Sequence, residues 1–271
     1  MPAATKRRRA KPDPVKSWVK RLDRTRPALM DDTLAAMRQM YGTPIWQRVY
    51  DPTSELVRTM LSANSADINA EKAFDLLCRC WPAQVKPGSV GTPRFRSGWG
   101  GVGISEATAD WAAVEFADIG ELTDVIRPGG LANQKAPRIQ AALRHIREAR
   151  GDYSLEFLGD LTPADALAWL TQVNGIGRKT ASVVLLFSFG KPLMPVDRHI
   201  ERVAMRIGLI PQKFTAEQMH DMLQVQLTER DVHQAHVNLI THGRQTCHAQ
   251  RPEHERCAIA DRCRFFNPKA P

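Results

Sequence analysis

The stretch LAWLTQVNGIGRKTASVVLLFSFG, residues 167–190, decides the fold. Apolar residues recur every three or four positions on both sides of NGIG (174–177), which predicts one helix before the NGIG and a second starting near Arg178. Two glycines separated by one apolar residue allow a tight hairpin, and Ile176 can fill the gap between the helices. The segment therefore predicts a helix-hairpin-helix over about 163–190.

The start of the second predicted helix has the properties of an anion site. The first backbone N–H groups of a helix have no partner within it, and the helix dipole adds positive potential there. Together they can hold a DNA phosphate. Backbone N–H donors do not distinguish one base from another, so this helix start would bind a duplex of any sequence. A Gly-x-Gly sequence on its own is more often only a turn, so a functional interpretation depends on motifs elsewhere in the chain.

The composition of all 271 residues is that of a folded protein. Hydrophobic residues make up 43% and charged residues 25%, which excludes collagen-like, low-complexity and fibrous classes. The longest apolar run, 183–187, is far short of the roughly 18 residues that a membrane helix needs, so we expect no membrane partner. Five cysteines and no apolar leader predict a reducing compartment: the cytoplasm or nucleoid of a bacterium, or the nucleus of a eukaryote.

The net charge of +9 is concentrated at the N-terminus. Residues 1–26 hold ten Lys and Arg against two Asp, a net of 10 − 2 = +8, and the remaining chain is almost neutral. We expect 1–26 to be a basic, disordered arm that attracts phosphates without specificity. Its KRRR run at 6–9 has the composition of an import signal as well as of a phosphate anchor.

The pattern elsewhere is helix after helix, which predicts an all-α fold. Pro52-Thr53-Ser54 and Thr162-Pro163 are typical helix starts, and Thr215 with Gln218 has the spacing of a capping box. Residues 86–105, rich in Gly, Pro and Ser, break the pattern. They are either a flexible linker or a loop that lays Arg and aromatic side chains on a nucleic acid.

The hairpin resembles the helix-hairpin-helix of DNA glycosylases, and a second segment narrows the resemblance. GIGRKTA is followed, eighteen residues after its Lys, by Asp197 in PVDRHI, and this combination is similar to the endonuclease III family. The resemblance spans about 50–265; the family usually has Pro where this chain has Asn174. It implies two helical domains with a DNA cleft between them: 46–191 with the hairpin, and 27–45 plus 192–271.

The resemblance also implies the reacting groups. Lys179 would attack the sugar C1′ and form a Schiff base, and Asp197 would stabilise the positively charged sugar. Taken singly, a Lys in a first helical turn is normally a solvated charge, and an Asp before a helix is normally an N-cap. Their occurrence together at the family's spacing favours catalysis.

Further residues are implied to contact DNA. The hairpin would present Gly175, Ile176, Gly177 and Arg178 to a phosphate. In LSANSAD, Asn64 stands where the family usually has a Gln that enters the duplex, and Leu131 in GLANQKA would be an apolar wedge. Both Asn64 and Leu131 are equally compatible with ordinary helix or loop positions.

Three of the five cysteines lie close together, and the segment 247–263 is compact and polar enough to need a metal to fold. The family pattern Cys-x6-Cys-x2-Cys-x5-Cys holds a [4Fe-4S] cluster, and this chain has His at its second position. An imidazole can replace a thiolate on iron, but three Cys and one His are also a common zinc set. His248 is an alternative ligand, and the absence of any metal is a third option. The implied ligands are Cys247, His254, Cys257 and Cys263.

The sequence therefore predicts a monomeric DNA glycosylase with abasic-site (AP) lyase activity, acting on duplex DNA with a damaged or deaminated base or an abasic site. Two alternatives remain. A monofunctional glycosylase would use Asp197 and water, and a non-catalytic helix-hairpin-helix protein would only bind DNA. The sequence does not identify the damaged base.

Overall fold

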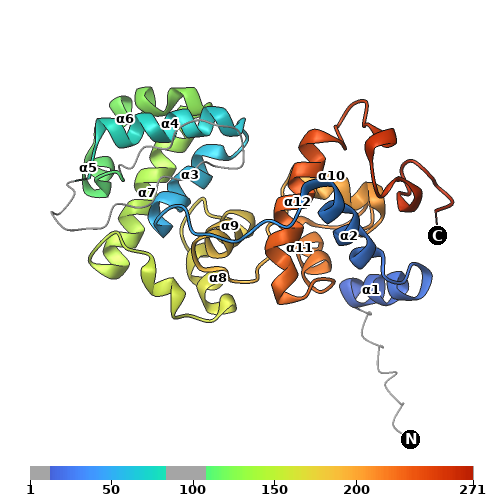
Figure 1. The fold of residues 1–271 in the computed structure, drawn as a ribbon. Coiled ribbons are helices and arrows are strands. Elements are labelled where there is room, and N and C mark those ends of the chain that lie inside the picture. Colours follow the sequence, from blue (N-terminus) through green and yellow to red (C-terminus); the bar gives the residue numbers. More distant parts are fainter. Residues whose placement is uncertain (1–12, 84–107, 271) are drawn as a thin grey trace, which may run out of the picture. The chain divides into compact units, whose positions relative to one another are not determined.

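The computed structural model describes residues 13–83 and 108–270, and every regular element in those ranges is helical (Figure 1). A single isolated bridge pairs Pro82 with Ala109. The predicted all-α class is confirmed, while the predicted 86–105 loop lies outside the described residues. None of the described helices is long and apolar enough to cross a membrane.

The chain divides into two compact units, Ile45–Pro195 and Met1–Pro44 with Val196–Pro271. The sequence predicts domains at 46–191 and at 27–45 plus 192–271. Residues 13–26 of the predicted arm belong to the second of these units.

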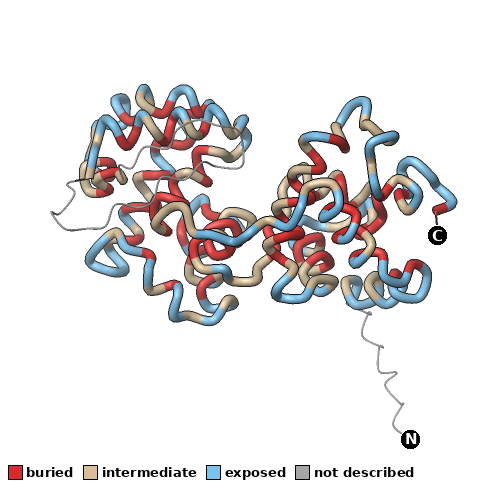
Figure 2. The backbone as a smooth tube through the Cα atoms, viewed as in Figure 1, coloured by how far each residue is buried: buried red, intermediate tan, exposed pale blue. Residues whose placement is uncertain are grey.

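The unit Ile45–Pro195 packs around one apolar core. Leu61 of α3, Leu77 of α4 and Leu143 of α7 are fully buried in it, and its buried positions are red in Figure 2. Its elements are α3 (Pro52–Ser62), α4 (Asp67–Cys80), α5 (Trp111–Phe116), α6 (Ile119–Ile126), η1 (Arg127–Gly129), α7 (Ala132–Arg150), η2 (Glu156–Gly159), α8 (Pro163–Thr171) and α9 (Arg178–Phe189).

The other unit joins N-terminal and C-terminal helices, and α2 packs on α12 within it. Met37 of α2 and Leu239 of α12 are fully buried. Its elements are α1 (Pro14–Thr25), α2 (Leu29–Tyr41), α10 (Arg198–Ile207), α11 (Ala216–Gln224), η3 (Glu229–Asp231), α12 (Val232–Gln245), η4 (His254–Arg256) and η5 (Ala260–Arg262).

The predicted helix starts are present. Asp51 caps α3 and Pro52 is its first residue, while the Thr162 side chain caps α8. Thr215 and Gln218 form the reciprocal hydrogen bonds of a capping box at α11. These local patterns set where the helices begin, because cap residues satisfy N–H groups that have no partner inside the helix.

Residues 13–26 of the predicted disordered arm differ from expectation. They form α1, whose Trp18 donates its indole N–H to the carbonyl of Leu209 at 2.9 Å. Arg26 is only 1% exposed and donates to the carbonyl of Ile207 at 2.7 Å. Burial lowers the pKa of Arg26 to about 10. Apolar residues between the charges give α1 a face to bury, which charge counting alone does not detect. Residues 1–12 lie outside the described part.

Candidate functional site

The hairpin between α8 and α9 is closed by its own backbone. The Ile176 N–H donates to the carbonyl of Val173 at 3.0 Å, and both side chains are buried. Gly175 has φ +87°, a left-handed conformation that a side chain would strain. Gly177 is the N-cap of α9, and its carbonyl accepts from Ala181 N–H at 3.0 Å. The predicted helix-hairpin-helix is therefore present.

The two glycines of the hairpin face different surroundings. A Cβ on Gly175 would lie 3.5 Å from the Arg138 side chain of α7, so Arg138 lies beside the hairpin. A Cβ on Gly177 would meet no described atom within 4 Å, and its φ of −89° suits any residue. The fold itself does not require glycine at 177. A glycine there keeps the backbone open to close approach by a partner.

The predicted nucleophile, Lys179, lies immediately after the hairpin in the sequence. Arg178 and Lys179 are the first two residues of α9, and both side chains are partly exposed. The dipole of a twelve-residue helix places positive potential at this end. An amine attacks a carbon centre in its neutral form.

Asp197 is the N-cap of α10 in the other unit. Its Oδ1 accepts a hydrogen bond from the Ile200 N–H at 2.8 Å, and its side chain is partly exposed. The capping role weighed from the sequence is therefore real. Capping uses one of two carboxylate oxygens, so the same group can also face a cationic sugar. Lys179 and Asp197 belong to different units, and their convergence on one sugar stays a prediction.

The structure joins the two segments that carry Asn64 and Leu131. The Ser65 hydroxyl donates to the carbonyl of Gly129, and Lys135 Nζ binds both of these residues. Asn64 is exposed, and Leu131 is 48% exposed. The segments that carry the predicted duplex-contacting residues are thus hydrogen-bonded to each other within the unit Ile45–Pro195. Sequence reasoning did not single out Lys135, because nothing local indicates that this lysine is buried.

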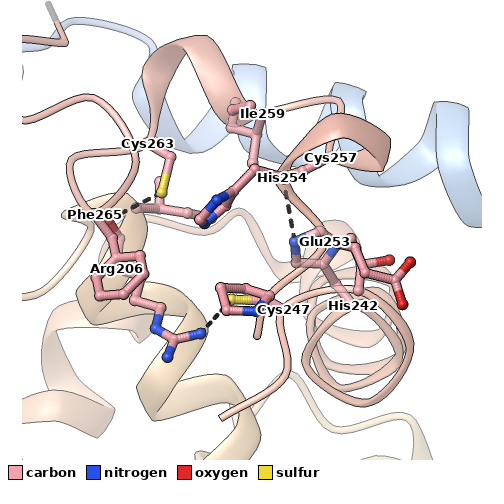
Figure 3. A pocket seen from close by; sticks show the side chains of 13 residues that line it. Arg206, His242, Cys247, Glu253, His254, Cys257, Ile259, Cys263 and Phe265 are labelled. Carbon is pink, nitrogen blue, oxygen red and sulfur yellow. Dashed lines mark hydrogen bonds between the residues drawn. The ribbon is translucent and has the colours of Figure 1, made fainter. Parts of the chain in front are cut away.

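The cysteines Cys247, Cys257 and Cys263 come together around one pocket at the C-terminal end of α12 (Figure 3). His254 also lines this pocket, with its ring 4.4 Å from that of Phe266, centroid to centroid. The four predicted ligands therefore share a site. In the described part of the chain, no group of three or more His, Cys, Asp or Glu is arranged around a single metal ion.

A second histidine, His242 of α12, lines the same pocket and was missed from the sequence. Its Nε2 lies 3.6 Å from Cys257 Sγ, and its Nδ1 lies 2.9 Å from the Tyr41 hydroxyl. Burial lowers the pKa of His242 to about 4, so its imidazole is neutral. The alternative ligand His248 is not among the pocket residues, and its Nε2 lies 3.4 Å from a Glu253 carboxylate oxygen.

Arg206 of α10 anchors the cysteine segment. Its Nη1 donates to Cys247 Sγ at 3.3 Å and to the carbonyl of His248 at 2.7 Å. The Cys263 thiol donates to the Arg206 carbonyl at 3.3 Å. Three thiols with an imidazole are a soft donor set that fits an iron-sulfur cluster.

Comparison with known families identifies the fold. Residues 57–228 match the HhH-GPD superfamily base excision DNA repair protein model. The chain is 30% identical over 211 residues to Endonuclease III of Sulfolobus acidocaldarius, covering 78% of this chain and 81% of that one. It is 29% identical over 213 residues to the DNA glycosylase/AP lyase ROS1 of Arabidopsis thaliana, covering 72% of this chain but only 15% of ROS1.

A solved structure has the same fold. It is that of a trapped endonuclease III–DNA covalent intermediate, with a TM-score of 0.67 and 24% identity, covering 89% of this chain and 97% of that one. The chain therefore belongs to the HhH-GPD superfamily of base excision DNA repair proteins, as a member of its endonuclease III family.

Proposed function

We propose that this protein is a bifunctional DNA glycosylase with AP lyase activity. The observation that carries the proposal is the position of Lys179, in the first turn of a helix whose N-cap glycine leaves room for a phosphate. The hairpin N–H groups and the helix dipole would hold the backbone of one strand. An amine at this position would lie next to the sugar that follows the bound phosphate.

Lys179 would perform both steps. Its neutral Nζ attacks C1′, the N-glycosidic bond breaks, and the base leaves with the bonding electron pair and takes up a proton. Ring opening gives a protonated Schiff base between Nζ and C1′. Loss of a C2′ proton then expels the 3′-phosphate by β-elimination, and water hydrolyses the Schiff base to regenerate the amine.

Asp197 would stabilise the positive charge that develops on the sugar as the base departs. A carboxylate fixed by its capping bond to Ile200 is already oriented, so no reorganisation is needed when that charge forms. The same group would help move the proton that leaves C2′.

The cluster ligands would be Cys247, His254, Cys257 and Cys263, and a [4Fe-4S] group would supply cross-links within 247–263. Zinc on the same ligands is the alternative. Visible absorbance with iron content, or zinc content in a colourless protein, separates the two. Holding this segment in place would also position its arginine side chains to contact DNA phosphates.

The substrate would be double-stranded DNA with a damaged base or an abasic site, bound by a monomer. A glycosylase of this kind works where the DNA is, in the cytoplasm or nucleoid of a bacterium or in the nucleus of a eukaryote. Duplexes with oxidised, deaminated, alkylated or mismatched bases, screened side by side, would identify the base.

Borohydride trapping on abasic-site DNA tests the proposal. Lys179→Gln should abolish the covalent adduct and strand scission while DNA affinity is largely kept. Lys191→Gln is the matched control, because Lys191 lies just past the other end of α9 and binds the carbonyls of Gly159 and Leu161. A covalent adduct formed by Lys179→Gln would show that another amine is the nucleophile. Base release from a damaged-base duplex by the wild type, without scission of abasic-site DNA, would make it monofunctional, and a mobility shift alone would leave only DNA binding.

A further inference from the structure

Lys135 is a buried lysine whose acceptors, among the described residues, are all uncharged oxygens. It lies in the first turn of α7, is 5% exposed, and forms no ion pair within the described residues. Burial lowers the pKa of its ammonium group. Lysine is almost never fully buried unless its charge is compensated, so this position is costly and needs a reason.

The ammonium group is compensated by three oxygen acceptors from two separate segments. Nζ donates to the carbonyl of Leu61 at 2.5 Å, to the Ser65 hydroxyl at 2.9 Å and to the carbonyl of Gly129 at 2.8 Å. The Ser65 hydroxyl itself donates to the Gly129 carbonyl. All three donors of one ammonium are used, and they join the end of α3 to the turn before α7.

Each joined segment carries an exposed residue in a left-handed conformation. Asn64 has φ +55° and Leu131 has φ +53°, in a chain where few other described non-glycine residues have positive φ. Such a conformation persists only where the surroundings hold it. The close packing here does so, since a Cβ on Gly129 would lie 3.0 Å from that of Ala73.

We infer that Lys135 is a positioning residue that ties Asn64 and Leu131 into one rigid wedge, an exposed amide beside an exposed apolar side chain. The inference rests on the proposed function. An apolar side chain that enters a base stack has to resist the force of restacking. Two separate flexible tips would fold back, whereas two tips fixed to one buried ammonium would not.

The tie should therefore matter only where DNA must be unstacked. A base in a duplex has to leave its stack before it reaches a pocket, at a cost of a few kcal/mol. An abasic site in a single strand has no such requirement. The three acceptors of Lys135 belong to neither α8 nor α9, so losing the tie removes no hydrogen bond of the helix that carries Lys179.

The experiment uses a duplex with 2-aminopurine next to a tetrahydrofuran abasic-site analogue. The fluorescence of this base rises when it is unstacked. Lys135→Met, which keeps the volume but removes the donors, should lower the fraction of unstacked complex about 10- to 100-fold. Its scission of single-stranded abasic DNA should equal that of the wild type. A general loss of structure would reduce both readouts.

Two further variants test whether Lys135 and Leu131 act through the same wedge. Leu131→Ala should lose the fluorescence rise, and the Lys135→Met/Leu131→Ala double variant should be no worse than either single variant, because both act through one wedge. Lys191→Met is the control. It removes another lysine bound to two carbonyls in the same unit, and it should leave both readouts unchanged.

Unchanged fluorescence in Lys135→Met, or additive losses in the double variant, would overturn the inference while leaving the proposed function intact. A wild type that neither nicks abasic DNA nor unstacks the probe would overturn both. If Lys135→Met does not fold, Ser65→Ala removes one acceptor and keeps the ammonium. It should weaken unstacking about fivefold. Unchanged fluorescence in Ser65→Ala would also contradict the positioning role of Lys135.

Discussion

The hairpin and the cysteine segment are held in opposite ways. Residues 172–177 are closed by backbone hydrogen bonds and by the buried side chains of Val173 and Ile176. Residues 247–263 contain only two short 3-10 turns, and Arg206 of α10 reaches in to bind their carbonyls and a cysteine sulfur.

The hairpin takes its shape from its own residues, whereas the cysteine segment depends on contacts from outside it. The hairpin is specified by local residues, and its geometry should persist whatever is bound. The cysteine segment buries little apolar surface of its own, and the metal group proposed to bind there would supply part of its stability. Damage to one region should therefore leave the other intact, which can be tested by changing single residues.

Asp197→Asn should give the largest effect. Asparagine can still accept the hydrogen bond from Ile200 and cap α10, but it loses the charge that we propose stabilises the sugar cation. Base release should slow about 100- to 1,000-fold while the visible spectrum of the cluster stays unchanged. A normal rate would reduce Asp197 to a helix cap, and a lost spectrum would show that the substitution disturbs α10, whose Arg206 binds the cysteine segment.

His254→Ala should act on the cysteine segment alone. Removing one ligand should weaken retention of the metal group by at least the roughly 10- to 100-fold that the loss of a supporting residue costs. His254→Cys should restore it. Iron release and absorbance measure this, and binding of the hairpin to undamaged duplex gives the comparison. Full retention in the alanine variant would direct attention to His242, which lines the same pocket.

Arg206→Met should have a smaller effect on the same segment. It removes the hydrogen bonds to Cys247 Sγ and to the carbonyls of His248 and Ala249, but leaves every ligand in place. We expect metal release to be faster by about tenfold. Arg138→Met is the matched control, since Arg138 lies beside the hairpin in the other unit. Equal metal release in the two variants would contradict the anchoring role.

Gly177→Ala should give the smallest change, and only in DNA binding. The added methyl meets no described protein atom, so the free energy of unfolding should change by about 1 kcal/mol or less. The methyl would stand where the phosphate approaches, and the Kd for duplex should rise about five- to tenfold, as for one lost hydrogen bond. A lower thermal stability with unchanged affinity would mean that the glycine serves the fold.

Local patterns in the sequence predicted the features that are made locally. The capping box of Thr215 and Gln218, the start of α8 at Pro163 and the hairpin all depend on residues within a few positions of each other. The all-α class followed from the same periodicity. Shared placement of the three cysteines was also predictable, because their spacing matches a known family pattern.

Features made by distant residues were not predictable. Arg26 was assigned to a solvated arm, yet it is buried against the carbonyl of Ile207, far along the chain. Lys135 and His242 carry no local mark of burial, and only the folded chain shows what surrounds them. Charge counting misplaced Arg26 because it treats each basic residue as exposed.

The division of the chain has a consequence for its synthesis. Ile45–Pro195 is one continuous stretch and can fold as soon as it leaves the ribosome, whereas α1 and α2 belong to a unit completed only by later residues. Until α12 emerges, the apolar side of α2, including Leu29 and Met37, stays uncovered. Nascent chains of this protein should therefore be targets for chaperones during that interval.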